Sequence, residues 1–476
     1  MNYFLTSRKP NLIYKIILNS FKNNFEKKKN IKSKLLLIRN EKIPNLEYLI
    51  FFLYLIFSGK IFQKDKRANI YFKKIQIGNH VLSRTYRNFK SYSSKIYFIY
   101  FMLKNFYIAG CIIKTSKKYL KNYNFKGVYL DHLMYLNGIY YQIFARHKKT
   151  IYSNVYPRSA FKVDFSKNKK KYFDFSKSIG LEHIRKSLKV GEKKKIKIFK
   201  KNYLKQSYKY IPWMVDTKYK KLDNFLKSKL NKYQYIIFPH SFTDAQMSRG
   251  FDGFETTYDW LIFTLEFLKK NNKKAIIKGH PNYYKKSRGI FSDWDKKIFE
   301  LVKKKYEKEK NFYFINKSIK NFDILNLLNK DCIGLTHHGT VILEMALLRL
   351  KTISSSKCPW DSKYSISNQW SNRNEYIKIL KKSWSRLKFS NQNDINKVYH
   401  QLYFNDNNYH GKYSIHSIMK KTLKKSYLKL KDNPKFFSTD VMSKNLIKQE
   451  KIFEKNFPLK KQKKFIEIFS NNIIEI

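Results

Sequence analysis

Two short polar segments carry the residue types best suited to chemistry in this chain. One is Lys278-Gly279-His280-Pro281, and the other is Thr336-His337-His338-Gly339-Thr340, which Glu344 follows after four residues. Each segment comes after a short apolar run that predicts a buried strand, and each precedes a helical pattern. Open α/β sheets bind ligands at the carboxyl ends of their strands, beside helix N-termini. The two segments are therefore expected to face one crevice and to bind a ligand that carries phosphate.

The first segment predicts a contact to a phosphate or a sugar. The imidazole of His280 can donate to a phosphate oxygen or a sugar hydroxyl, and Pro281 fixes the backbone so that this ring projects. Lys278 adds positive charge beside it. The alternative is an ordinary surface turn, because His-Pro pairs are common after strands.

The second segment predicts the closer phosphate contact. Gly339 allows backbone amides to approach a phosphate, and Thr340 can cap the helix or bond the phosphate. Glu344 lies one helical turn further, where a carboxylate can hold a ribose diol. The alternatives are a capped helix start with exposed His337 and His338, or a metal site. The spacing is not that of a recognised zinc pattern, so no metal is expected.

Acid and base candidates lie in the loop after another predicted strand. His240, Asp244 and Asp252 follow Tyr235-Ile236-Ile237-Phe238 in a long polar loop. Loops at that edge of a sheet line the ligand cleft, so these side chains are candidate general bases or sugar contacts. Ordinary loop carboxylates are the alternative, although the chain is poor in acidic residues.

The first half of the chain predicts an acceptor side for the same crevice. Asp131 and His132 stand where the strand Gly127-Val128-Tyr129-Leu130 ends, and His80 and Arg84 occupy a similar place one unit earlier. A carboxylate or imidazole there would face the opposite domain and activate an acceptor hydroxyl. The alternative is a helix capped by Asp131 with a solvated His132.

The composition limits the classes of protein that fit. The 476 residues are 43% hydrophobic and 17% aromatic, which is enough apolar surface to exclude a disordered chain. The formal net charge of +66 favours anionic substrates and membrane surfaces. Lysine is spread over every segment together with Asn, Ile, Tyr and Phe. This distribution indicates that a compositionally biased genome is the main cause of the excess positive charge. No nucleic-acid-binding motif is present, so no specific nucleic acid is expected as a partner.

Apolar runs predict strands over 71–76, 127–130, 150–152 and 312–315, and helical patterns predict helices over 135–146 and 257–271. This order of elements indicates an α/β protein in which strands and helices alternate. The three cysteines show no metal-ligand spacing and make no even framework, which favours a reducing, cytoplasmic compartment. The longest apolar stretch, Leu46 to Phe57, is too short to span a membrane, since that takes roughly 20 residues, and we interpret it as a buried or interfacial helix. The predicted parts are a helical basic lead-in (1–65), an N-terminal Rossmann-like domain with the acceptor side (66–165), a Lys-rich connector (166–230), a C-terminal Rossmann-like domain with the phosphate-binding segments (231–385) and a helical tail (386–476).

Several segments together resemble a known group of proteins. Pro239-His240 through Asp244, then Thr257-Tyr258-Asp259-Trp260-Leu261, then Ile277 through Pro281 and Thr336 through Glu344 are similar to segments of bacterial capsule and surface-polysaccharide biosynthesis proteins. That group resembles glycosyltransferases of the GT-B architecture, in which two Rossmann-like domains face a central cleft. The resemblance covers about residues 230–360 and extends faintly over Ile77 to Arg87 and Lys126 to Tyr152.

The resemblance implies a function and a set of roles. It assigns contact with the donor phosphates to His280, Gly339 and Thr340, and ribose or base contact to Glu344. It implies a nucleotide-sugar donor, a glycan or lipid-linked glycan acceptor, and no cofactor beyond that donor. A peripheral place at the anionic inner membrane face is a further expectation. Arg349 and Lys351 stand where the family often has a glycine and a proline, which bears on the identity of the nucleotide.

Three other functions remain open at this point. One is an enzyme that transfers a polyol phosphate from a CDP-linked donor, since such enzymes also use paired histidines on a GT-B frame. A nucleotide-sugar epimerase of similar fold would need no acceptor. A basic nucleic-acid-binding protein is the alternative from a different class, and it would concentrate its lysines on one face.

Overall fold

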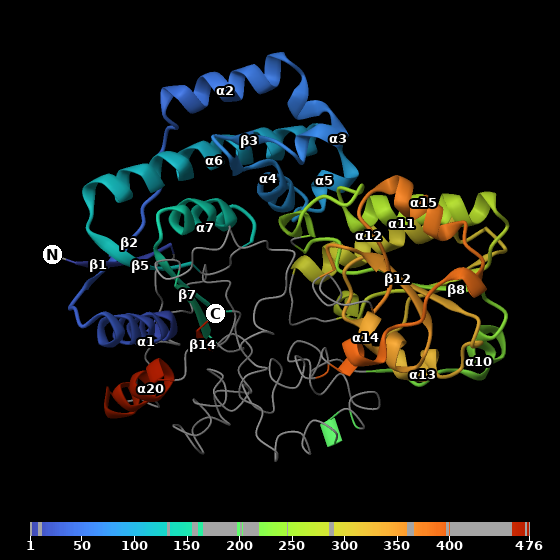
Figure 1. Cartoon of the computed structure of the whole chain (residues 1–476). Coiled ribbons are helices and arrows are strands. Elements are labelled where there is room, and N and C mark those ends of the chain that lie inside the picture. The colour runs from blue at the N-terminus through green and yellow to red at the C-terminus, as the bar shows by residue number, and fades with distance from the viewer. Residues whose placement is uncertain are drawn as a thin grey trace.

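The chain forms two α/β domains that lie side by side (Figure 1). The structure is a computed structural model, and it describes residues 2–7, 12–130, 134–154, 160–164, 198–199, 202, 219–244, 246–284, 290–358, 366–396, 399, 459–471 and 474–475. Each domain is built on one six-stranded sheet flanked by helices. The predicted α/β class with two Rossmann-like domains is confirmed.

The C-terminal domain contains a fully parallel sheet in the order β10-β9-β8-β11-β12-β13. Numbered along the chain, these strands lie in the order 3-2-1-4-5-6 of a doubly wound nucleotide-binding fold. Its strands are β8 (Tyr235–Phe238), β9 (Ala275–Lys278), β10 (Phe312–Ile315), β11 (Ile333–Thr336), β12 (Lys351–Ser355) and β13 (Asn368–Trp370). Its helices are α10 (Asn224–Leu230), α11 (Thr257–Lys270), α12 (Ile290–Tyr306), α13 (Asn321–Leu325), α14 (Val341–Leu347) and α15 (Arg373–Leu380).

Alternation along these strands produces the two cores of the C-terminal domain. Ile236 and Ile276 point to one face, where they pack with residues of α13 and α14. Ile237, Ile277 and Leu335 point to the other face and pack under α11, α12 and α15. A parallel sheet covered on both sides needs apolar residues at nearly every strand position, which is why β8, β9 and β11 are buried throughout.

The N-terminal domain contains a mixed sheet in the order β14-β7-β6-β5-β1-β2. All neighbouring strands are parallel except β6 and β7. Its strands are β1 (Tyr3–Thr6), β2 (Lys34–Leu37), β5 (Phe125–Tyr129), β6 (Thr150–Asn154), β7 (Ala160–Asp164) and β14 (Ile474–Glu475). The predicted strand-helix-strand unit over residues 127–152 is confirmed, with α7 (Asn137–Arg146) as its helix.

Helices α1 (Leu12–Lys29), α6 (Lys95–Asn122) and α7 pack on the sheet of the N-terminal domain, and α20 (Leu459–Asn471) covers α1. Leu5, Val128 and Ile151 pack in one core with α6 and α7. On the opposite face, the rings of Phe21 and Phe25 of α1 pack against strand aromatics, with Phe21 stacked on Tyr129 at 5.3 Å between ring centroids. α20 packs against α1, below the sheet in Figure 1.

The structure corrects three predictions about organisation. Residues 1–65 are not a separate helical lead-in, because β1 and β2 belong to the N-terminal sheet. The predicted strand over 71–76 is an antiparallel hairpin of β3 (Tyr71–Phe72) and β4 (Ile75–Gln76), which turns at Lys73 and Lys74 with φ values of 47° and 68°. The chain end returns to the N-terminal domain through α20 and β14, so residues 386–476 are not an independent tail.

Boundaries drawn from composition also miss where the second core begins. Leu230 and Phe199 are buried in the core of the C-terminal domain, although both lie in the predicted connector. Most of that connector lies outside the described residues. Ile395 and Tyr399, assigned to the tail, pack in the same core.

The segment between β2 and β5 forms a helical layer above the N-terminal sheet. Its helices are α2 (Leu46–Phe57), η1 (Lys60–Phe62), α3 (Lys64–Arg67), α4 (Gly78–Thr85), α5 (Lys90–Ser93) and α6. Among the described residues, α6 is the helix long and apolar enough to cross a bilayer, and half of its most apolar window is buried in the protein. Its buried side chains form much of the core of this domain.

Contacts from this helical layer join the two domains. The guanidinium of Arg67 donates to both carboxylate oxygens of Glu255, with Nε 2.6 Å from Oε1, and the hydroxyl of Tyr86 donates to Oε2 at 2.8 Å. Tyr92 donates to the carbonyl of Phe242 at 2.5 Å. These bonds tie the segment from α3 through α5 to the segment between β8 and α11.

Candidate functional site

The site is centred where the strand order of the C-terminal sheet reverses. β8 and β11 are neighbours there, and their helices lie on opposite faces of the sheet. His240 comes two residues after β8 ends, and His337 and His338 come directly after β11. Doubly wound sheets bind ligands at this reversal, outside the carboxyl ends of the strands. The topology therefore places three predicted histidines at the expected ligand position.

A glycine-rich loop delivers a carboxylate to these histidines. Gly250 and Gly253 have φ values of 111° and 99°, a region that residues with a Cβ rarely adopt. A Cβ on Gly253 would lie 2.4 Å from the backbone nitrogen of Arg373. The tight backbone between them buries Asp252 at 1% exposure.

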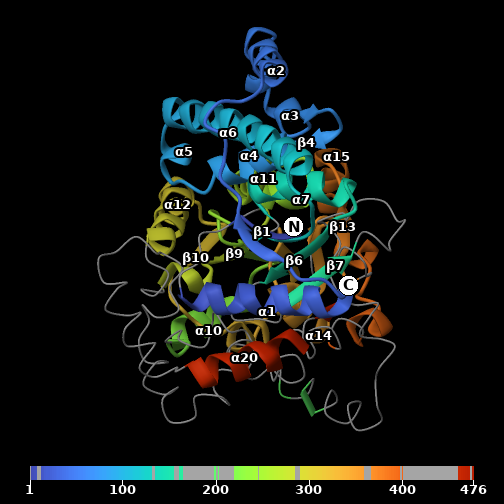
Figure 2. The same cartoon turned by 90° about the vertical axis from the view of Figure 1, so that its left-hand side faces the viewer.

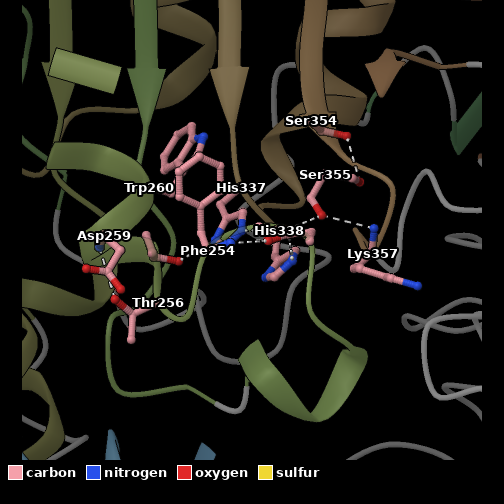
Figure 3. A network of polar contacts seen from close by, with 12 residues as sticks. Phe254, Thr256, Asp259, Trp260, His337, His338, Ser354, Ser355 and Lys357 are labelled. Atoms are coloured by element: carbon pink, nitrogen blue, oxygen red, sulfur yellow. Dashed lines mark hydrogen bonds and ion pairs between the residues drawn. The ribbon is translucent and has the colours of Figure 1, made fainter. Parts of the chain in front are cut away.

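Asp252 anchors a hydrogen-bonded network, which we call the Asp252 network: Asp252, Thr257, His337 and Ser355. Figure 3 labels His337 and Ser355 of this network. Its Oδ2 lies 2.8 Å from His337 Nε2 and accepts from the Ser355 hydroxyl. Since a carboxylate only accepts, Nε2 of His337 carries the proton. The hydroxyl of Thr257 lies 3.0 Å from Nδ1 of the same ring. Both ring nitrogens are therefore held, and the orientation of His337 is fixed.

Aromatic side chains hold the same imidazole from its faces. The ring of His337 stacks on Trp260 at 5.4 Å and on His338 at 3.9 Å between centroids. Figure 3 shows Trp260 beside His337 above the network. This sandwich fixes the ring of His337 against His338, and the predicted contact of His337 with the donor remains a prediction.

His338 is the polar side chain without a hydrogen bond at the centre of the site. It is 2% exposed, and neither ring nitrogen bonds to any residue that the structure describes. Its Nε2 lies 3.7 Å from Asp252 Oδ2, which is beyond hydrogen-bond range. Burial lowers the pKa of His338 well below its usual range, and the charges of His337, Arg249 and His240 lower it further. A buried imidazole of this kind is a donor or acceptor for a group that enters the site.

Three arginines gather where the two domains meet, and we call them the arginine cluster: Arg84, Arg87 and Arg249. Arg249 lies in η4 (Gln246–Arg249), which packs against α4 of the N-terminal domain, the helix that carries Arg84. The guanidinium of Arg87 lies 4.6 Å from the ring centroid of Tyr135. Burial lowers the pKa of Arg249, and the charge of Asp244 opposes this. Arg84 and Arg249 form no ion pair within the part of the chain that the structure describes, so the cluster offers positive charge to an anion.

The predicted base candidates His240 and Asp244 lie at the same junction. Nε2 of His240 is 4.0 Å from Oδ2 of Asp244, and Oδ1 of Asp244 accepts from Tyr135 of the other domain at 3.4 Å. The rings of His240 and His280 are 5.6 Å apart. The structure therefore brings together His240, Asp244 and His280, which the sequence placed in two separate segments.

Lys278 and Glu344 lie in the interior, at 1% and 2% exposure. Burial lowers the pKa of Lys278 to about 8, and the nearby charge of Glu344 opposes this shift. Asn321 donates to Glu344 at 3.3 Å. Their predicted contacts with a ligand remain predictions, but a buried lysine with a lowered pKa beside a carboxylate is typical of a functional site.

The glycine turn after β11 serves the backbone of the protein itself. The amide of Gly339 donates to Thr336 Oγ1 at 3.1 Å, and a Cβ on Gly339 would lie 2.5 Å from that oxygen. Thr340 makes no side-chain capping bond to α14, and this helix has only 7 residues. In this arrangement Thr336 accepts from the Gly339 amide, and the predicted phosphate contact through that amide remains a prediction. Pro281 is buried at the start of η5 (Pro281–Tyr284), as a strand-end turn requires.

The predicted acceptor residues have different surroundings. His80 is 2% exposed and packs so closely on Gly138 that a Cβ there would lie 2.0 Å from its Cε1. It packs as a core residue of the N-terminal domain, and its predicted contact with an acceptor remains a prediction. Arg84 is exposed on the same helix and belongs to the arginine cluster. Asp131 and His132 lie outside the described residues.

Burial of His80 predicts how stability depends on pH. Burial lowers the pKa of His80 to about 4 from its ordinary value of 6.5. Above pH 6.5 the ring is neutral in both the folded and the unfolded chain, but below it only the unfolded chain gains a proton. The free energy of unfolding is therefore expected to fall between pH 6.5 and 4, by about 3 kcal/mol from this residue. Urea unfolding at pH 7 and 4.5 measures the fall, and an equal fall in His80→Gln would refute the assignment.

Metal ligation is the other chemistry that this site could suggest. Ligand atoms of Asp252, His337 and His338 lie within 4.8 Å of one another. However, Oδ2 of Asp252 already accepts from two donors, and the two rings stack at an interplanar angle of 18°, which directs their nitrogens side by side. Arg249 adds positive charge nearby. These features suit a hydrogen-bonded site better than a metal centre, and the expectation of no metal remains a prediction.

Five residues of the site were missed from the sequence: Arg87, Tyr135, Thr257, Arg249 and Ser355. One signal could have found the arginines. Most basic residues of the chain are lysine, so the positions that keep arginine are candidates for a requirement that lysine does not meet. Arg67, Arg84, Arg87 and Arg249 all lie at the junction of the domains.

Comparisons with known proteins give a distant structural likeness. No family model and no curated protein matches this sequence. A crystal structure of Methanocaldococcus jannaschii UDP-GlcNAc 2-epimerase in complex with UDP-GlcNAc and UDP is 14% identical over 85% of this chain and 99% of that chain, with a TM-score of 0.26. A second structure of UDP-GlcNAc 2-epimerase from the same organism is 12% identical with the same coverage and a TM-score of 0.25.

Proposed function

We propose that this protein is a glycosyltransferase that moves a sugar from a nucleotide-sugar donor to a growing surface polysaccharide. The observation that carries the proposal is the cationic junction at the strand reversal. There, the buried and unbonded His338 lies close to Arg249, opposite α4 of the other domain. A diphosphate brings two negative charges, and bidentate arginine contacts suit them. An acceptor hydroxyl bound at the junction of the two domains would come within reach of His240.

The proposed reaction uses residues on both sides of the junction. His240, with Asp244 beside it, takes the proton of the acceptor hydroxyl. The acceptor oxygen forms a bond to the anomeric carbon as the bond from that carbon to the diphosphate oxygen breaks. The arginine cluster and His338 stabilise the negative charge that develops on the departing nucleotide. Fixed positive charge of this kind replaces a metal ion in the proposed step.

The acceptor and the place of action belong to the same proposal. A glycan or lipid-linked glycan would lie against the N-terminal domain, on the side of Tyr135 and Arg84. The protein would act in the cytoplasm at the inner face of the membrane, where lipid-linked acceptors are presented. The net charge of +66 supports an anionic surface as a partner.

A second candidate is the transfer of a polyol phosphate from a CDP-linked donor. The 5.6 Å approach of the His240 and His280 rings favours it, because paired imidazoles can share acid and base roles at a phosphoryl group. Turnover with CDP-polyol and with nucleotide-sugars, each with and without a glycan acceptor, separates the two reactions. Product that forms from a UDP-sugar without any acceptor would instead indicate an epimerase.

Nucleotide binding is the first test of the proposal. We expect one of CMP, CDP, UDP, GDP or ADP at millimolar concentration to raise the melting temperature at about 0.3 M salt, where non-specific attraction is screened. Arg249→Gln should lower the affinity of the protein for that nucleotide about 10- to 100-fold, which corresponds to the loss of one hydrogen bond to a charged group. Arg386→Gln is the matched control, because Arg386 is exposed on the same domain. A melting point that shifts only with single-stranded DNA would contradict the transferase and support a basic nucleic-acid-binding protein.

A further inference from the structure

The outer face of α2 is apolar and open to solvent. Five of its large apolar side chains are exposed, and we call them the α2 face: Leu46 (72%), Ile50 (60%), Leu53 (49%), Tyr54 (52%) and Phe57 (85%). Soluble proteins scatter such residues singly, and a contiguous set marks a contact surface. The reaction proposed above does not use this face.

Helical geometry gathers these residues into one stripe. At 100° per residue, their positions fall within an arc of about 100° along the helix. The opposite side holds Tyr48 and Leu55, which are buried in the core, and the Tyr48 hydroxyl donates to the carbonyl of Phe106 at 2.8 Å. The inner contacts fix the rotation of the helix, so the α2 face must point outward.

The charges around the α2 face are largely positive. Lys42 precedes the helix, and Lys60 and Lys66 follow it, all exposed. Lys60 lies 2.9 Å from the hydroxyl of Tyr54 at the edge of the stripe. The carboxylate within the helix, Glu47, is paired with Lys73 and lies 3.8 Å from Lys117. A lipid surface would thus meet apolar side chains with cations beside them.

The position of α2 leaves this face accessible. Figures 1 and 2 show α2 at the top edge of the molecule, outside both sheets. Ile43 before the helix and Phe62 after it are also exposed, at 59% and 43%, and extend the apolar surface at both ends. Exposed apolar side chains therefore continue from Ile43 to Phe62 along the outer side of this segment.

We propose that the α2 face docks on an anionic lipid bilayer, with the helix lying in the plane of the headgroups. Its 12 residues make a helix of about 18 Å, too short to cross a hydrocarbon core of about 30 Å. An apolar stripe with lysines at its edges is the pattern of an interfacial helix. A second copy of this chain would bring the same lysines and a net charge of +66 against this face, whereas anionic lipid attracts them.

Vesicle flotation of the full chain tests this surface. Binding is expected with vesicles of phosphatidylglycerol and phosphatidylcholine, and it should be much weaker with phosphatidylcholine alone. Ile50→Glu/Phe57→Glu should lower the partition coefficient about 10- to 100-fold, because two apolar anchors become charged. Leu301→Glu/Leu327→Glu is the matched control, with the same charge change at positions 43% and 41% exposed on the other domain, and it should bind as the unaltered chain does.

A labelled variant reports the contact itself. The three natural cysteines are all buried, so Ile50→Cys can be labelled selectively with an environment-sensitive fluorophore. Its emission should shift to the blue with the anionic vesicles and not with phosphatidylcholine alone. Equal flotation of Ile50→Glu/Phe57→Glu and Leu301→Glu/Leu327→Glu would overturn the proposal. So would light scattering that shows a dimer broken by Ile50→Glu/Phe57→Glu, since the α2 face would then join two copies.

Discussion

Glu255→Ala is expected to lower the free energy of unfolding by about 3–5 kcal/mol. Glu255 is 1% exposed and accepts two bonds from Arg67 and one from Tyr86 across the domain junction. Burial raises the pKa of Glu255, against the guanidinium of Arg67, which lowers it. Removal of the carboxylate leaves a buried guanidinium without its partner, and this desolvated charge is the source of the loss. Urea unfolding at pH 7, followed by tryptophan fluorescence, measures it.

Two variants show whether the loss comes from the buried pair. Arg67→Met/Glu255→Met removes both charges and should be more stable than Glu255→Ala, because no unpaired ion remains. Lys64→Gln breaks the exposed interdomain pair with Asp259, whose atoms are 2.9 Å apart, and should cost under about 1 kcal/mol. If Glu255→Ala costs no more than Lys64→Gln, the domains do not meet through this pair.

Asp252→Asn is expected to lower kcat by about 10²- to 10³-fold, the usual effect of losing one preorganised electrostatic group. Asp252 accepts the proton of His337 Nε2 at 2.8 Å, and His337 in turn stacks on His338 at 3.9 Å. An amide in this position can place its own N–H against that proton, so the ring loses its fixed orientation. Because Asp252 acts through the histidines, the KM for the donor should change far less than kcat.

The controls separate positioning from folding. Ser355→Ala removes one donor to the same carboxylate and should lower kcat less than 10-fold, because His337 keeps its bond to Asp252. The melting-point shift produced by the nucleotide should persist in Asp252→Asn. Loss of that shift with unchanged kcat would instead show that Asp252 is a ligand contact.

Local patterns in the sequence determined the elements of the C-terminal domain. The apolar run Phe312 to Ile315 is the strand β10 with the same bounds, and Thr257 to Asn271 differs from α11 by one residue. Strands buried on both faces must be apolar throughout, and this pattern is visible in short windows. The polar residues after β8, β9 and β11 could therefore be recognised as residues at the edge of one sheet. Shorter pieces such as β13 and α15 were missed because polar residues interrupt them.

Patterns were weakest where an element depends on distant partners. β1 and β2 have four residues each and become strands by pairing with each other and with β5, far along the chain. β14 has two residues and pairs with β7 across most of the sequence. Such strands carry little local signal, because their hydrogen bonds and burial come from the neighbours. The basic lead-in and tail were therefore assigned as extensions, although both contribute to the N-terminal sheet.

The sequence by itself determined the α/β class, two Rossmann-like domains and the four histidines after strand ends (His240, His280, His337 and His338), since each follows from short-range periodicity. Only the tertiary structure decided which of these residues meet. It placed Asp252 against His337, Asp244 against Tyr135 of the other domain, and Arg249 in contact range of α4. It also showed that His80 is a core residue and that the Gly339 amide is already bonded. Strand order and domain contact arise from packing between distant segments, which no local pattern encodes.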